Sequence, residues 1–83
     1  LVNQVADADG YDAMVSAMAA QLAALPTVAL GYMKGNLNAA YTGTLSQALD
    51  REAAGMARCF TTEDHKNAVK AFVEKRAPEF QGR

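Results

Sequence analysis

Apolar residues recur at spacings of three and four along most of the chain, which is the pattern of one face of an α-helix. This spacing predicts helices over about residues 10–25, 26–41 and 45–59, and a fourth from about residue 62 to the basic pair at 75–76. The residues that form these faces are, in chain order, Tyr11, Met14, Val15, Met18, Leu22, Leu25, Leu30, Met33, Leu37, Tyr41, Leu45, Leu49, Ala53, Met56, Phe60, Val69, Phe72 and Val73.

Helix-breaking and helix-starting residues separate these segments. Pro26 ends the first helix and suits the first turn of the second. Gly43 is a natural helix-stop residue, and Pro78 forbids further helix after the fourth segment. The N-caps expected from the sequence are Asp9, Thr44 and either Thr61 or Thr62.

The first five residues, LVNQV, have strand-like composition and no helical spacing. A lone strand cannot pair its backbone N–H and C=O groups, and no second strand of similar strength follows. We therefore interpret residues 1–8 as the last strand and loop of a sheet that lies outside this chain. Residues 9–83 are then a helical subdomain, so the predicted fold class is all-α with about four helices after a short strand remnant.

The composition indicates a partner surface. Of the 83 residues 51% are apolar and 20% are charged, whereas a chain of this length hides only about 60–65% of its unfolded surface. The alternative is that alanine inflates the apolar count. A net charge of −1 argues against nucleic acid or an anionic membrane as partner. A single cysteine fits a reducing compartment, and no apolar run reaches the roughly 18–20 residues that span a bilayer.

Catalytic and metal-binding patterns are not evident. Cys59 and His65 are six residues apart with no carboxylate placed to orient them, and one His with one Cys cannot complete a zinc site. We expect His65 to be a solvated surface residue and Cys59 a small packing residue. The sequence therefore predicts no catalytic residue and no metal ligand in this chain.

The end of the fourth helix allows two interpretations. Phe72 with Lys75 and Arg76 could hold a phosphate while the ring packs on a purine. The simpler interpretation is that the basic pair complements the helix dipole and that Phe72 belongs to the core stripe. The residues alone favour the simpler one.

Several motifs resemble the C-terminal part of the crotonase superfamily, whose largest branches are enoyl-CoA hydratases and isomerases. They are LVNQV, P-x-x-A at 26–29, K-x-x-L-N-x-A at 34–40, and T-x-D-H…A-F-x-E-K-R-x-P-x-F-x-G at 62–82. The resemblance covers essentially the whole chain. Its closing motif does not separate the activities within the superfamily.

The resemblance implies an upstream spiral β/α core followed by a helical subdomain that builds a homo-trimer or a dimer of trimers, which is a hexamer. It implies hydration of an enoyl-CoA thioester, or a shift of its double bond, as in fatty-acid β-oxidation. The two catalytic glutamates and the oxyanion-hole amides would lie in that core, so this chain alone would be inactive. Coenzyme A would be part of the acyl-CoA substrate, with no separate cofactor. A bacterial cytoplasmic location is expected, and a mitochondrial matrix or peroxisome is also compatible.

Four residues are candidates for the coenzyme A pocket by motif match. Phe72 and Lys75 would lie near its adenine and phosphate end, and Met56 stands where some hydratases have an aromatic residue. Phe60 would line the same region, although core packing is its simpler role. Arg76 also matches the motif, and we expect it to form a structural ion pair.

Two other classes of function are compatible with the sequence. The same fold carries other acyl-CoA reactions, including those of phenylacetate-pathway isomerases, dehalogenases and naphthoate synthases. A non-enzymatic helical interaction module is the remaining alternative, and LVNQV argues against it because such a module would not keep an unpaired strand.

Overall fold

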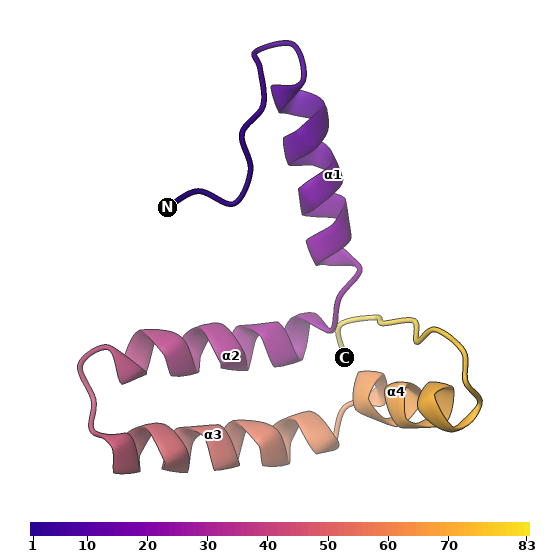
Figure 1. Cartoon of the computed structure of the whole chain (residues 1–83). Helices are drawn as coiled ribbons and strands as arrows, with labels where there is room; N and C mark the ends of the chain where they lie inside the picture. The colour runs from indigo at the N-terminus through magenta and orange to yellow at the C-terminus, as the bar shows by residue number, and fades with distance from the viewer.

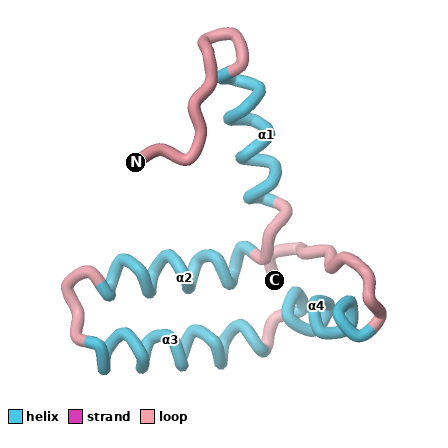
Figure 2. Tube along the Cα trace, in the orientation of Figure 1, coloured by secondary structure: helices cyan, strands magenta, loops and turns pink.

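The computed structural model describes all residues from 1 to 83 and contains four helices and no strand (Figures 1 and 2). The four predicted helices are confirmed, with boundaries that differ by at most three residues. The helices are α1 (Tyr11–Ala23), α2 (Thr27–Ala40), α3 (Leu45–Phe60) and α4 (Glu63–Val73).

The segment before α1 runs as an irregular chain beside no other strand (Figure 2). Nothing in these 83 residues offers it an edge to pair with, so the predicted strand at Leu1–Val5 does not form here. Its assignment to a sheet elsewhere in a longer protein stays a prediction.

Helices α2 and α3 form an antiparallel hairpin, and α4 follows at the far end of α3 (Figure 1). At the hairpin contact, Gly55 is buried against Tyr32, and a Cβ at that glycine would lie 3.5 Å from the Tyr32 side chain. Helix α1 projects away from this group and meets α2 at an angle of 101° (Figure 1). No single helix is long and apolar enough to cross a membrane; α1 and α2 would pass only as a bent pair, on length and composition alone.

Local capping bonds explain where α3 and α4 begin. The Thr44 hydroxyl accepts a hydrogen bond from the Gln47 N–H at 3.3 Å, and the Gln47 side chain accepts one from the Thr44 N–H at 2.9 Å. This reciprocal capping box satisfies two amides that the helix itself cannot pair. At α4 the Thr62 hydroxyl accepts from the His65 N–H at 3.1 Å, so Thr62 rather than Thr61 is the N-cap.

The expected N-cap of α1 is wrong. The helix starts after Gly10, which has no side-chain cap, and Asp9 makes no capping bond. Instead the Asp7 carboxylate accepts from the Gly10 N–H at 2.9 Å and closes the preceding turn. Asp9 lies inside the turn of residues 8–10 that Asp7 closes, so its side chain does not act as the cap of the helix.

The chain buries almost no core. Three of 83 residues are buried, and Ala71 is the only apolar one. The accessible surface is 6949 Å², against about 4,800 Å² for a folded monomer of this mass. The radius of gyration is 16.2 Å, against about 12 Å for a compact chain of this length. The surplus apolar surface that the composition predicts is therefore present, and it lies along the helices.

Because so little apolar area is buried, we expect the 83-residue chain prepared alone not to fold cooperatively. The gain from burial falls short of the roughly 1–2 kcal/mol per residue that ordering the backbone costs. Circular dichroism at micromolar concentration should show a shallow thermal melt without a defined midpoint. A sharp two-state melt of a monomeric species, with its mass checked by sedimentation, would contradict this expectation.

Candidate functional site

Helix α4 ends in a left-handed turn centred on Lys75. The helix stops at Val73, and Lys75 has φ = 54°, the only positive φ outside glycine. The Lys75 N–H donates to the Phe72 carbonyl at 3.2 Å, and the Arg76 N–H donates to the Ala71 carbonyl at 3.0 Å. This pair of bonds is the Schellman motif, which most often has glycine at the left-handed position. Lysine there costs about 1–2 kcal/mol.

The basic pair therefore lies just beyond the helix, not in its last turn as the sequence pattern suggested. The basic residue of the last turn is Lys70, which lies 3.9 Å from Glu74. Both residues follow the C-terminal end of the helix directly, so the dipole interpretation stays a prediction.

Arg76 is held by several partners. Its Nε lies 2.7 Å from Glu74 Oε2, its Nη2 donates to Asn67 Oδ1 at 3.1 Å, and its Nη1 donates to the Ala77 carbonyl at 3.2 Å. The structural ion pair expected for Arg76 is confirmed. The hydrogen bond from Arg76 lowers the pKa of Glu74, with Lys70 contributing. The stabilisation from this pair is thus present at neutral pH and is lost as the pH falls through the lowered pKa.

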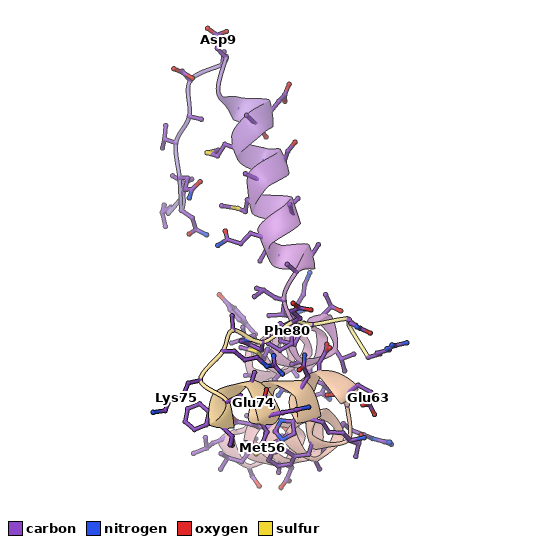
Figure 3. All side chains as sticks on the ribbon, turned by 90° about the vertical axis from the view of Figure 1, so that its right-hand side faces the viewer. Asp9, Met56, Glu63, Glu74, Lys75 and Phe80 are labelled. Carbon is purple, nitrogen blue, oxygen red and sulfur yellow. The ribbon has the colours of Figure 1, made fainter.

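Lys75 and Phe72 are left free at the tip. The Lys75 side chain makes no hydrogen bond or ion pair within the chain and points outward at the end of α4 (Figure 3). Phe72 is 85% exposed, and its stripe neighbours Val69 and Val73 are also exposed at 51% and 75%, so the core-stripe interpretation of Phe72 stays a prediction. Within this chain α4 buries only Asp64 and Ala71.

The other two candidates lie on α3. Met56 and Phe60 are one turn apart and about half exposed, at 53% and 54%. The Phe60 ring packs edge-on against His65, with ring centroids 4.6 Å apart. His65 is therefore half-buried against a ring, and its expected role as a solvated residue is wrong. The structure brings Phe72 and Lys75 together at one tip and Met56 and Phe60 together on one helix face, with no ring contact between the two pairs.

A buried carboxylate fastens the tail that follows the tip. Asp64, 4% exposed, accepts hydrogen bonds from the Gln81 N–H at 2.7 Å and the Gly82 N–H at 2.9 Å. Its own N–H donates to the Arg83 carbonyl at 2.9 Å. The sequence patterns above assign Asp64 no role of its own. The motifs could have indicated this contact, because the aspartate of T-x-D-H accepts a hydrogen bond from the glycine of x-F-x-G in the structure.

The tail crosses the start of α2. Gly82 has φ = 71°, and a Cβ added there would lie 2.5 Å from Thr27 Oγ1, so both conformation and space require glycine. Phe80 reaches into an apolar hollow whose lining includes Pro26, Ala29, Cys59 and Ala68. Cys59 is thus half-buried among apolar neighbours, as expected for a packing residue.

The chain is similar to known proteins both in sequence and in fold. The family model of enoyl-CoA hydratase/isomerase matches residues 1–83. The 1,2-epoxyphenylacetyl-CoA isomerase of Escherichia coli (strain K12) is 34% identical over 83 residues, which are 100% of this chain and 32% of that protein. A protein of Mycobacterium tuberculosis (strain CDC 1551 / Oshkosh) described as an enoyl-CoA hydratase gives the same identity and coverage.

A solved structure shares the whole arrangement. The crystal structure of a Mycobacterium abscessus protein, described as an enoyl-CoA hydratase/isomerase, superposes with a TM-score of 0.94 at 34% identity. The match covers 99% of this chain and 32% of that one. The chain thus spans about a third of the length of these relatives, and its outstretched helices recur in a chain about three times as long.

Replacing Gly82 by alanine should release the tail from α4. The left-handed conformation costs an alanine about 1–2 kcal/mol, and the new methyl group would press on Thr27. In the intact protein we expect amide exchange at residues 81 and 82 to speed up about tenfold. Glu79→Ala is the matched control, because the tail uses the backbone carbonyl of this residue and not its side chain. Equal exchange in Gly82→Ala and wild type would show that the tail does not depend on this turn.

Proposed function

The chain belongs to the enoyl-CoA hydratase/isomerase family, and on that premise we propose that it is the C-terminal helical part of an enzyme acting on acyl-CoA thioesters. The reaction proposed for the whole enzyme is the hydration of an enoyl-CoA or a shift of its double bond. Within that enzyme the segment contributes contacts between subunits and the coenzyme A end of the substrate pocket.

The observation that carries this proposal is an extended helical arrangement without a core of its own. Three buried residues in 83 cannot hold α1 away from α2 and α3, yet the same arrangement recurs at a TM-score of 0.94 in a much longer chain. The surface in excess of a compact monomer is about 2,000 Å², the scale of a specific protein–protein interface. We propose that this surplus surface is covered by the upstream core and by further copies of the enzyme, in a trimer or a dimer of trimers.

The tip of α4 suits the adenosine end of coenzyme A. That end combines a flat purine ring with several phosphate charges. Phe72 offers an exposed ring and Lys75 an unpaired ammonium group, while the neighbouring Arg76 is already engaged. A lysine held at positive φ is the kind of local strain that collects at binding sites. Met56 and Phe60 then border the same pocket from α3.

The steps of catalysis belong to groups outside this segment. A general acid–base pair of glutamates would move the protons, and two backbone amides would stabilise the charge that develops on the thioester oxygen. Within this segment the residues bind and position the coenzyme A moiety, which stays unchanged in either reaction.

A second candidate reaction is favoured by the comparison with the Escherichia coli relative. An epoxyphenylacetyl-CoA isomerase matches the chain at the same 34% as the mycobacterial relative described as a hydratase. A segment that binds coenzyme A is compatible with both reactions, because both substrates carry that moiety. Turnover of a short enoyl-CoA by the whole enzyme supports hydration; turnover of the epoxide alone supports the second reaction.

We expect the 83-residue chain alone to leave a short enoyl-CoA unchanged, since it contains no acid–base pair beside a thioester site. The assay follows the ultraviolet absorbance of the conjugated thioester. The whole enzyme under the same conditions is the positive control. Turnover by the pure fragment, with contaminating hydratase excluded, would overturn the proposal.

Replacing Lys75 by glycine separates the charge from the turn. Glycine suits the left-handed position and should leave the enzyme as stable or up to about 1 kcal/mol more stable. Loss of one charge-assisted phosphate contact should weaken coenzyme A binding by about 1.5–3 kcal/mol, which is at least tenfold. Titration calorimetry gives the affinity, and Lys34→Ala removes a lysine from α2 as the charge control. Unchanged affinity would leave Lys75 with a structural role only.

A further inference from the structure

Asn67 links α4 to both the turn and the tail that follow it. Its Oδ1 accepts a hydrogen bond from Arg76 Nη2 at 3.1 Å, and its Nδ2 donates to the Glu79 carbonyl. These partners lie nine and twelve residues further along the chain. A guanidinium can only donate and a carbonyl can only accept, so the two partners fix the orientation of the amide. Both ends of this one side chain are therefore used.

The bond to Asn67 acts on the residue next to Lys75. The Arg76 backbone N–H closes the Schellman turn on Ala71, and its guanidinium is held by Asn67 and Glu74. Lys75 stands between two residues whose side chains are bonded to each other. A lysine at φ = 54° keeps this conformation only where its surroundings over-determine it. Asn67 supplies the contact that reaches back to the body of the helix.

We propose that Asn67 is a positioning residue for the coenzyme A site: it fixes Arg76 and the tail, and thereby holds Lys75 in the left-handed turn with its ammonium group free to meet phosphate. This inference rests on the proposed function of Lys75. It adds a residue that touches no substrate and acts through its neighbours. The chemistry is specific to an amide, because alanine removes both bonds, while aspartate keeps the acceptor for Arg76 and loses the donor to Glu79.

The test uses the whole enzyme and two substrates that differ only at the adenosine end. One is the coenzyme A thioester, and the other is the same acyl group on pantetheine, which lacks the nucleotide phosphates. For Asn67→Ala we expect KM for the coenzyme A thioester to rise about three- to tenfold with kcat unchanged. The KM for the pantetheine thioester should not change. Asn38→Ala, an exposed asparagine on α2 with no side-chain bond, is the matched control.

A double substitution tests whether Asn67 acts through Lys75. Lys75→Ala alone should raise KM for the coenzyme A thioester about tenfold, and adding Asn67→Ala should change it by less than twofold, because the two changes remove one contact. Asn67→Asp keeps the bond to Arg76 and should fall between wild type and Asn67→Ala. If Asn67→Ala fails to fold, the same comparison of substrates with Asn67→Asp decides the matter.

The outcomes separate this inference from the function on which it rests. An equal rise in KM on both thioesters, or a fall in kcat, would mean that Asn67 has a general structural role and would overturn the inference. An effect of Lys75→Ala without any effect of the Asn67 variants would also overturn it, while the proposed function of Lys75 stands. If Lys75→Ala leaves KM for the coenzyme A thioester unchanged, Lys75 does not contact the phosphates. Both the proposed role of Lys75 and the inference about Asn67 are then wrong.

Discussion

The structure depends on one imbalance: the chain carries far more apolar surface than its own contacts bury. Ala71 is the only buried apolar residue, while side chains such as Leu37 and Tyr41 are 71% and 94% exposed. The hydrophobic effect is the main force that holds helices together, so the arrangement of α1 against α2 and α3 needs a larger body to press on. The relatives that match this chain are about three times as long, and we propose that the remainder of such a protein is that body.

The polar contacts differ in the length of chain that they connect. Capping bonds at Thr44 and Thr62 set where helices begin, and they are local to one turn. Asp64 works over a longer range and fastens the tail across α4. The tail in turn supports the turn that presents Lys75. A surface tip thus keeps a defined geometry even though no core lies beneath it, because each bond to the tail comes from a well-formed helix.

The sequence predicted those features that depend on neighbouring residues. Helix positions follow from apolar spacing, and the caps at Thr44 and Thr62 follow from hydroxyls placed just before each helix. The cap at Asp9 failed because that residue lies inside the turn that Asp7 closes, and the helix begins only after Gly10. Similarly, the motif match grouped Phe72 with Lys75, and the Lys75 N–H bonds the Phe72 carbonyl in the turn that ends α4.

Features that depend on distant partners could not be predicted in this way. The burial of Asp64 goes with its hydrogen bonds to the tail, whose N–H groups lie 17 and 18 residues further along the chain. The edge-on contact of His65 with Phe60 spans only five residues, but it joins two helices and so depends on how α4 is placed against α3. The positive φ of Lys75 has no local sequence signal, because glycine is the residue that usually marks such a turn.

Hydrogen exchange of the whole enzyme, measured by mass spectrometry with and without coenzyme A, tests most directly whether the outward faces are covered while the tip stays open. We predict that peptides from α1, α2 and α3 exchange slowly in both conditions, because other parts of the enzyme cover their apolar faces. The peptide that carries Phe72 to Arg76 should exchange faster and slow down when coenzyme A is added. Fast exchange throughout α1 to α3, or a tip indifferent to coenzyme A, would contradict this picture.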